Sequence, residues 1–286
     1  MAGGTFDKAV GKVRPGTYIN FESAAQETLS GSDRGTVLIP LIGHSYGPEK
    51  EFISLSAKSP DAYAEKLGYS VYDDNPSMLL IREAFKNAST VIVYIPKSGA
   101  KASGTGGGLK AEARYGGSRG NSLSFSVSAN PVDGFDVAVY LDAAPVESYE
   151  GIKTAAELSE SRYIAFSADA ESSVEAAAGV SLLGGTDVTT ANSDITAFLD
   201  AMERVHFNTL AFPSTDETLI TACVSKIKYL RENAGKSVKA VVADFKADYE
   251  GIINVTNSVV VNGTTLTNAQ ATAWVAGADA GALSTQ

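Results

Sequence analysis

Residues Gly43 to Gly47 have the sequence Gly-His-Ser-Tyr-Gly, which is the Gly-x-Ser-x-Gly spacing of a nucleophile elbow. In that motif, a serine on a sharp turn between a strand and a helix presents its hydroxyl oxygen for attack on an ester. An expected strand precedes Ser45, but Pro48 and the extended segment EKEFISLS follow it where a helix is needed. No His-Gly-Gly-Gly segment supplies an oxyanion hole. A serine hydrolase is therefore kept as an alternative function.

Other nucleophiles and metal ligands are sparse. His44 and His206 are the only histidines, and Cys223 is the only cysteine. The sequence has no His-Glu-x-x-His, His-x-His or Cys-x-x-Cys spacing, so it predicts neither a zinc site nor an internal disulfide. Cys223 shares a helical apolar stripe with Ile227 and Leu230, which predicts a buried thiol. His206 follows the last turn of a helix, where the helix dipole favours a cation.

Two further patterns resemble binding sites only in composition. The segment GTGGGLK, residues 104–110, is rich in glycine, but Lys110 is not followed by Ser or Thr, so it fails the phosphate-loop pattern. We expect this segment, with the residues from Ser98 onward, to be a flexible hinge. Asp73 and Asp74 precede a helix, where the dipole stabilises acidic side chains. The sequence thus predicts no cofactor and no catalytic or metal site.

Composition narrows the function classes. The chain has 286 residues, of which 44% are hydrophobic, and its formal net charge is −10. A net negative charge argues against binding to nucleic acid or to an anionic membrane. The sequence has neither a signal peptide nor an apolar stretch of about 18 residues that could span a bilayer. We therefore expect the protein to be made and folded in a cytoplasm.

The pattern of strands and helices divides the chain into four regions. Residues 1–34 are predicted to form an extended arm. Residues 35–97 and 187–286 both alternate strands with helices, whereas residues 98–186 have the period of β-strands. We therefore predict a mixed α/β fold (α+β overall), in which a discontinuous α/β core domain carries an inserted small β-rich domain.

Several elements of the α/β regions are expected from local signals. Asn75 and Pro76 are preferred at the start of a helix. The segments NTLAF and SVKAVVAD flank a helix capped by Ser214 and Glu217, which predicts parallel strands joined by a right-handed crossover. The other expected elements are a strand from Thr36 to Gly43, a helix from Ser59 to Leu67, a strand in STVIVYIP and a helix that opens at Ser193.

The last helix of the sequence begins with a capping box. Thr267 and Gln270 have the required spacing, and Ala271, Trp274 and Val275 then recur at helical intervals along an apolar face. No strand follows that could close the unit. We therefore expect the chain to stop partway through a domain.

The β-rich region contains two strictly alternating segments. LSFSVSA and FDVAVYL are separated by NPVDG, which predicts an antiparallel hairpin with one exposed face. The other expected elements are strands in RYIAFSA and VSLLGG and a helix around residues 152–159.

Five segments carry a resemblance to a known family: PGTYINF, GTVLIPLIGHSYGP, FISLSAKSPDAYAEKLGY, ARYGGSRGNSLSFSV and SLLGGTDV. In this order they resemble the tail sheath protein of contractile-tailed phages, particularly the form found in prophages and phage-tail-like bacteriocins of Gram-positive bacteria. The most specific motif is Tyr115, Gly116, Arg119, Gly120 and Asn121, which leads into a strand. The segment with Gly184, Gly185 and Asp187 resembles the Leu-x-Gly-Gly-x-Asp motif that closes the inserted domain, but it has Val188 where glycine is usual.

The resemblance implies a structural subunit and not an enzyme. Six subunits would form a ring around the tail tube, and stacked rings would contract to drive the tube through the target cell envelope. The implied partners are further copies of the chain, the tail tube protein, and the baseplate and tail terminator proteins, with no nucleic acid and no membrane. The implied location is the virion tail or a tail-like particle, assembled in the bacterial cytoplasm.

The resemblance also assigns roles to the two ends of the chain. The N-terminal arm would add a strand to the sheet of a neighbouring subunit. Its expected residues are Val13, Pro15, Gly16, Tyr18, Ile19 and Phe21. Sheath proteins of this family continue into a C-terminal domain, which this chain is expected to lack. A β-sandwich module that binds at a cell surface remains a further alternative, disfavoured by the missing signal peptide.

Overall fold

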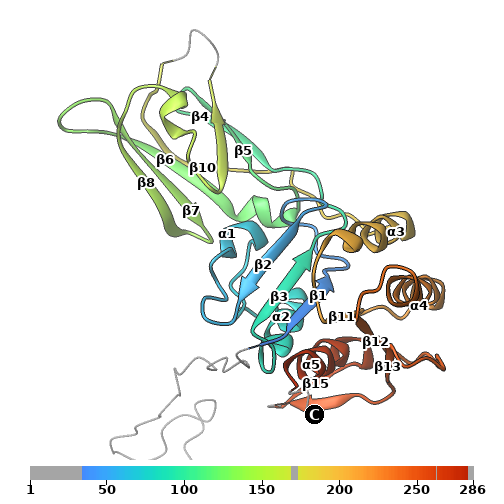
Figure 1. Ribbon diagram of the computed structural model, residues 1–286. Coiled ribbons are helices and arrows are strands. Elements are labelled where there is room, and N and C mark those ends of the chain that lie inside the picture. The colour runs from blue at the N-terminus through green and yellow to red at the C-terminus, as the bar shows by residue number, and fades with distance from the viewer. Residues whose placement is uncertain (1–33, 169–172, 262, 283–286) are drawn as a thin grey trace, which may run out of the picture.

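The computed structural model describes residues 34–168, 173–261 and 263–282. Figure 1 shows two units, an α/β unit built on a six-stranded sheet and a β unit built on a four-stranded and a three-stranded sheet. The β unit lies in the chain between strands that belong to the α/β unit. This arrangement confirms the predicted mixed α/β (α+β) fold class.

The sheet of the α/β unit is parallel apart from one edge strand. In spatial order its strands are β13 (Ile252–Val255), β12 (Lys239–Ala243), β11 (Thr209–Ala211), β1 (Thr36–Pro40), β3 (Thr90–Tyr94) and β2 (Phe52–Ser56). Only β2 runs antiparallel to its neighbour. Because a parallel sheet is covered on both faces, its inner strands are continuous apolar runs, and Val37, Leu38 and Ile39 are fully buried.

Helices cover both faces of this sheet. They are α2 (Pro76–Phe85) and α5 (Asn268–Gly281) on one face, and α3 (Asn192–Ala201) and α4 (Glu217–Glu232) on the other. Successive side chains of a strand point to opposite faces. Accordingly, Val37 and Ile39 pack with α2 and α5, whereas Leu38 packs with α3 and α4. The predicted unit of β11, α4 and β12 is confirmed, with parallel strands.

Local signals located two helix starts correctly. Asn75 caps α2, and its side chain accepts hydrogen bonds from the main-chain N–H groups of Ser77 and Met78. Thr267 and Gln270 form the predicted capping box of α5. The Thr267 N–H donates to Gln270 Oε1 at 2.9 Å, and the Gln270 N–H donates to Thr267 Oγ1 at 3.3 Å.

Other predictions for the α/β unit were wrong in detail. The N-cap of α4 is Asp216 and not Ser214, because the Asp216 carboxylate accepts the free N–H groups of the first turn. Trp274 was predicted on an apolar face with Ala271 and Val275; the three residues line the same apolar hollow, in which Ala271 is buried but Trp274 is 43% exposed. The helix expected to open at Ser193 begins at Asn192.

Two expected elements are shorter than predicted. The strand expected to reach Gly43 ends at Pro40, after which the chain turns. The helix expected from Ser59 is the single turn α1 (Ala64–Leu67), which a left-handed Gly68 ends.

The β unit is formed by two antiparallel sheets with a common core. The four-stranded sheet has the order β10 (Ala177–Ser181), β6 (Leu123–Ala129), β7 (Phe135–Leu141) and β8 (Ala144–Ile152), and the three-stranded sheet has the order β4 (Ser103–Gly106), β5 (Leu109–Ala113) and β9 (Ile164–Ser167). The predicted hairpin of β6 and β7 is confirmed. Phe125 and Val139 are paired across it, and both are fully buried.

The predicted hinge was wrong. Ser103–Gly106 is a strand, and Gly107 and Gly108 form the tight turn between β4 and β5 with φ values of 61° and 71°. Glycine adopts this left-handed conformation at no steric cost, so the glycine run is a hairpin turn. The helix expected around residues 152–159 is a short 3₁₀ turn. The remaining elements are η1 (Ser118–Ser122), η2 (Ala155–Leu158), η3 (Met202–Arg204), β14 (Val259–Val261) and β15 (Thr264–Leu266).

Three further expectations can be compared with the described residues. Cys223 is fully buried, as predicted, and burial raises the pKa of its thiol. None of the described helices combines the length and the apolar character needed to cross a bilayer. The predicted arm residues Val13, Pro15, Gly16, Tyr18, Ile19 and Phe21 lie outside the described residues, and their role stays a prediction.

The core of the β unit makes a stability prediction. Phe125 is fully buried and packs edge-on against Phe166, with ring centroids 5.3 Å apart. Phe125→Ala should lower the free energy of unfolding by about 3–5 kcal/mol, as measured by urea denaturation. Val132→Ala, at a site that is 91% exposed, should leave it unchanged. Equal effects of the two changes would contradict the described core.

Candidate functional site

The connections between the two units pair with each other. The outgoing connection contains Ala100 and Ser103, and the returning connection contains Leu183 and Thr186. Ala100 and Thr186 exchange main-chain hydrogen bonds of 3.0 and 3.3 Å, and Ser103 and Leu183 exchange bonds of 2.8 and 2.9 Å. The two connections therefore form a short antiparallel ladder, which we call the linker ladder.

A third main-chain segment touches this ladder at two glycines. A Cβ atom at Gly116 would lie 1.8 Å from the carbonyl oxygen of Gly99, and a Cβ atom at Gly99 would lie 1.8 Å from the carbonyl oxygen of Thr186. No side chain fits at such distances. Gly116, singled out by its motif, therefore permits backbone contact between the β unit and the linker ladder.

The other motif residues surround the same contact. The side chain of Asn121 donates to the carbonyl oxygen of Gly185 and accepts from its N–H, both at 2.8 Å. Asp187 accepts from the N–H and the hydroxyl of Ser118 at 2.8 and 2.6 Å, at the start of η1. The structure thus brings together the predicted residues Tyr115, Gly116, Gly120, Asn121, Gly184, Gly185 and Asp187.

Aromatic and small residues fill the space around these hydrogen bonds. The ring of Tyr115 stands edge-on to the ring of Tyr46, with centroids 5.7 Å apart. Gly120 is buried, and a Cβ atom there would lie 3.0 Å from the Cβ of Ala102. Tyr115 and Gly120 therefore have a packing role at the junction.

Ser45, the candidate nucleophile, forms hydrogen bonds within the same junction. Its hydroxyl donates to the carbonyl oxygen of Val188 at 3.2 Å and accepts from the Val188 N–H at 3.0 Å. The residue is 5% exposed. A serine whose hydroxyl is buried and bonded in both directions to the main chain holds the returning connection in place.

His44 is buried and does not serve Ser45 as a base. Its Nε2 donates to the carbonyl oxygen of Leu67 at 3.1 Å. Burial lowers the pKa of His44 from 6.5 to about 4. The imidazole is therefore neutral at pH 7, and it ties the loop after β1 to the end of α1.

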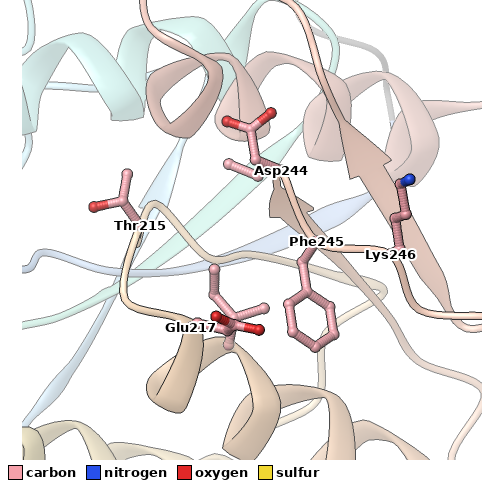
Figure 2. Close-up of a pocket in the computed structure, with 7 residues that line it drawn as sticks. Thr215, Glu217, Asp244, Phe245 and Lys246 are labelled. Carbon is pink, nitrogen blue, oxygen red and sulfur yellow. The ribbon is translucent and has the colours of Figure 1, made fainter.

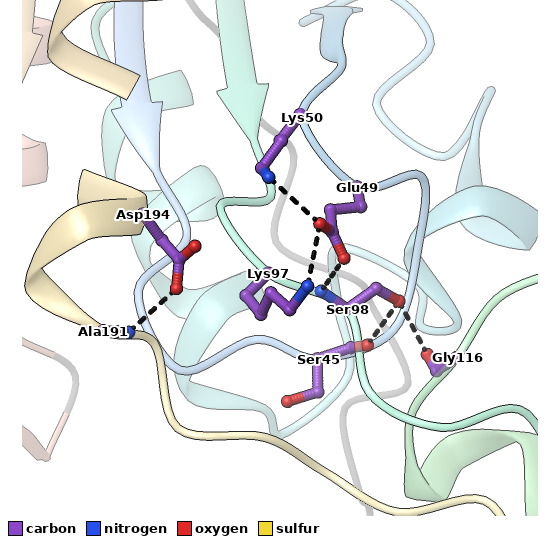
Figure 3. A network of polar contacts seen from close by, with 8 residues as sticks. All are labelled: Ser45, Glu49, Lys50, Lys97, Ser98, Gly116, Ala191 and Asp194. Atoms are coloured by element: carbon purple, nitrogen blue, oxygen red, sulfur yellow. Dashed lines mark hydrogen bonds and ion pairs between the residues drawn. The ribbon is translucent and has the colours of Figure 1, made fainter. Parts of the chain in front are cut away.

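A polar network anchors the outgoing connection to the α/β unit (Figure 3). Glu49 accepts from the Lys97 ammonium at 3.0 Å and from the Ser98 N–H at 3.1 Å. The Ser98 hydroxyl contacts the carbonyl oxygens of Ser45 at 3.1 Å and Gly116 at 3.4 Å. Burial alone would raise the pKa of Glu49, but the bonds from Ser98 and Lys97 outweigh it and hold that pKa below its usual range.

Arg119 joins the two units, and its role was missed in the sequence. Its Nε donates to the buried carbonyl of Gly68 in the α/β unit at 2.6 Å, and its guanidinium pairs with Asp142 of the β unit at 2.6 Å. It also lies over the ring of Tyr69, 4.5 Å from the centroid. The hydrogen bond from Arg119 lowers the pKa of Asp142. No local pattern could reveal these partners, because they lie far from Arg119 in sequence.

A separate hollow of about 550 Å³ lies at the carboxyl ends of β11 and β12, beside the start of α4 (Figure 2). Glu217, Asp244 and Lys246 are among its lining residues. The Asp244 carboxylate is already bonded by the side-chain amide of Asn268 at 2.8 and 3.0 Å. Within the described part of the chain, His, Cys, Asp and Glu side chains form no group that could hold a metal ion.

Comparison with known proteins gives consecutive family matches. Residues 34–94 match the model described as Tail sheath protein Gp18 domain III N-terminal region. Residues 97–187 match Phage tail sheath protein beta-sandwich domain, and residues 188–286 match Phage tail sheath protein central domain. Together, the matched segments span both units of the structure.

Individual relatives agree with these matches. The chain is 41% identical to Phage-like element PBSX protein XkdK of Bacillus subtilis, across the whole of this chain and 65% of that protein. It is 39% identical to the sheath tail protein of Desulfitobacterium hafniense, with a TM-score of 0.79 over 93% of this chain and 62% of that chain. A sheath tail protein of Listeria innocua is 42% identical, with a TM-score of 0.79 over 88% and 57% of the two chains. This chain therefore spans less than two thirds of each of these relatives.

The burial of His44 predicts acid sensitivity. The folded state binds fewer protons than the unfolded state between pH 6.5 and about 4, so the free energy of unfolding falls as the pH is lowered through this range. The loss attributable to His44 should reach about 3 kcal/mol below the folded-state pKa. Urea denaturation at several pH values should show a flatter profile for His44→Gln, whose amide can still donate to Leu67. Identical profiles would contradict a neutral, buried His44.

The position of Arg119 predicts coupling between the units. Arg119→Met should leave the buried carbonyl of Gly68 unpaired and lower the free energy of unfolding by about 1–3 kcal/mol. It should also speed hydrogen exchange at the Ala100 and Thr186 amides of the linker ladder. Asp142→Asn is the matched control. The Asp142 side chain is 57% exposed, so its replacement should lower the free energy of unfolding by less than about 1 kcal/mol. Unchanged exchange in Arg119→Met would refute the coupling.

Proposed function

Since the chain belongs to the phage tail sheath protein family, we propose that it is a subunit of a contractile sheath that packs as stacked hexameric rings around a tail tube. The chain is a structural protein of a phage tail and not an enzyme. Contraction of the sheath would drive the tube through the envelope of a target cell. The particle would be a phage tail or a phage-tail-like bacteriocin, assembled in the bacterial cytoplasm.

One observation carries this proposal. The three sheath models match consecutive segments from residue 34 to residue 286, and the fold superposes on that of a sheath tail protein with a TM-score of 0.79. The sequence has no phosphate-loop motif, so we propose that the work of contraction comes from the lattice. Extended and contracted packings would be two states of the same contacts, and the baseplate would trigger the change between them.

The junction supports a mechanical role for the subunit. The linker ladder, the Asn121 and Gly185 pair and the Arg119 bridge connect the units at several points. Such a subunit can move as a rigid body when its neighbours slide. Contacts between subunits that do not close into a ring generate helical assemblies, as a stacked sheath requires.

The remaining partners are proposed from the family. The N-terminal arm, residues 1–34, would add a strand to a neighbouring subunit. The tail tube protein would lie inside the sleeve, and the baseplate and tail terminator proteins would lie at its ends. The serine hydrolase alternative is not supported, because the Ser45 hydroxyl is bonded to the main chain of Val188.

Assembly can be tested by electron microscopy. The chain extended by the part of XkdK that it does not match should form hollow tubes or six-fold rings in negative stain. This chain alone should remain a monomer or a small oligomer. The extended protein without residues 1–33 should fold, by circular dichroism, but fail to assemble because the arm is missing.

Two results would count against the assembly proposal. One is an extended protein that is folded but stays monodisperse, even with purified tail tube protein added. The other is assembly of the arm-deleted protein into the same tubes, which would refute the role of the arm.

A further inference from the structure

A hollow of about 500 Å³ lies at the amino ends of the neighbouring strands β11 and β12. One wall is the segment before β11, which contains Arg204 and His206. The other wall is the segment before β12, which contains Lys236 and Ser237. Because the two strands are parallel and paired, the segments that lead into them lie side by side. The fold therefore brings polar side chains from two separate segments to one hollow.

The polar side chains that line this hollow can all donate hydrogen bonds. They are Arg204, His206, Asn208, Lys236 and Ser237. The amide oxygen of Asn208 already accepts the N–H of Thr36 at 2.8 Å. None of the described residues that line this hollow is acidic, whereas the hollow beside the start of α4 contains Glu217 and Asp244. In a chain with a net charge of −10, a hollow of this composition is suited to an anion.

The basic side chains of this hollow are not neutralised within the described part of the chain. The side chains of Arg204 and His206 have no hydrogen-bond or ion-pair partner there. The Lys236 ammonium donates to the main-chain carbonyl oxygen of Glu203, which carries no charge. The carboxylate of Glu203 instead pairs with Lys226 at 2.6 Å. An anion in the hollow would therefore meet positive charge that no described carboxylate offsets.

We propose that this hollow binds a multiply charged oxyanion, either a phosphate ester or a polycarboxylate. The Arg204 guanidinium presents parallel N–H groups that match two oxygens of such an anion, and charge-assisted hydrogen bonds of this kind are strong. The volume of the hollow, about 500 Å³, is that of a site for a small molecule. The acidic surface of a second copy is a poorer occupant, because two copies with a net charge of −10 repel each other.

An oxyanion in this hollow would act on the stability of the sheet. Held by Arg204 and Lys236, it would tie the segment before β11 to the segment before β12. A ligand that binds only the folded state stabilises that state increasingly as its concentration rises. The free energy of unfolding would therefore depend on the concentration of the oxyanion. This site lies apart from the junction of the two units, and the inference does not depend on assembly or contraction.

Calorimetric titration of the whole chain with inorganic pyrophosphate tests the site. The ionic strength is held constant with sodium chloride, so that general screening is the same at every point. We expect saturable binding of one pyrophosphate per chain, and a thermal unfolding midpoint that rises with its concentration. Citrate is the second probe, because it is a polycarboxylate. Tighter binding of pyrophosphate would assign the site to phosphate esters, and tighter binding of citrate would assign it to polycarboxylates.

Arg204→Gln and Lys246→Gln form a matched pair of variants. Each removes one positive charge from an exposed residue, but Lys246 lines the hollow at the carboxyl ends of the same strands. Arg204→Gln should weaken pyrophosphate binding at least about tenfold, because it removes hydrogen bonds between charged groups. Lys246→Gln should leave the affinity unchanged. Circular dichroism checks that both variants are folded.

A measurement on the unchanged chain keeps the test decisive if a variant does not fold. In nuclear magnetic resonance spectra, the amide signals of Gly235 and Ser237 should shift on titration with pyrophosphate, and that of Phe245 should not. Gly235 and Ser237 line the proposed site, whereas Phe245 lines the hollow at the carboxyl ends of the strands.

Several results would overturn the inference. They are the absence of saturable binding of either probe, equal losses of affinity in the two variants, and amide shifts at Phe245 without shifts at Gly235 and Ser237. Sedimentation velocity tests the other occupant. Self-association of the chain without any oxyanion, abolished by Arg204→Gln, would reassign the hollow to the acidic surface of a second copy. These readouts need no tubes or rings, so they remain interpretable if assembly fails.

Discussion

The structure depends on the close approach of three main-chain segments at Gly99, Gly116 and Thr186. Peptide groups can meet at this distance only where no Cβ atom stands between them. Around that contact, Asn121 pairs with a peptide group of the returning connection, and Arg119 bridges to the α/β unit. A buried peptide group must be hydrogen-bonded, so each of these contacts also satisfies a polar group that the junction hides from water.

The Gly-x-Ser-x-Gly segment around Ser45 lies where an α/β enzyme commonly has its active site. The loop after β1 lies at the carboxyl edge of a parallel sheet, next to the point where the strand order changes direction between β1 and β11. Open α/β sheets commonly bind ligands at that point. Here the returning connection occupies it, with Val188 bonded to the Ser45 hydroxyl. The same geometry therefore holds a second structural unit where another protein would hold a substrate.

Local sequence signals predicted the elements whose stability is itself local. The cap at Asn75, the capping box at Thr267 and the alternation in β6 and β7 were correct because each depends on residues a few positions apart. The glycine run after Ser103 was misjudged, because a flexible linker and a tight hairpin turn have the same composition. Trp274 lies with Ala271 and Val275 as helical spacing predicted, but spacing does not show how much of such a face the neighbouring elements cover.

The candidate site was likewise predicted only in part: its motif residues were identified, but their contacts were not. Motif similarity identified Tyr115, Asn121 and Asp187 without revealing what they contact. Gly185, the partner of Asn121, is 64 positions away in the chain, and Ser118 is 69 positions from its partner Asp187. Arg119 could not be assigned a role, since Gly68 and Asp142 belong to different units. Long-range pairing of this kind is decided by the whole fold and leaves no trace in a short window of sequence.

The discontinuous sheet has a consequence for synthesis on the ribosome. The central pair of strands joins β1 to β11, and the side chain of Asn208 accepts from the N–H of Thr36, 172 positions earlier. Strand β1 must therefore wait with one edge unpaired while the whole β unit is translated. At about 5–20 residues per second, this wait lasts on the order of ten seconds. The β unit is continuous in sequence and can fold within that interval, so a nascent chain that pauses before residue 209 exposes an apolar strand edge to its neighbours.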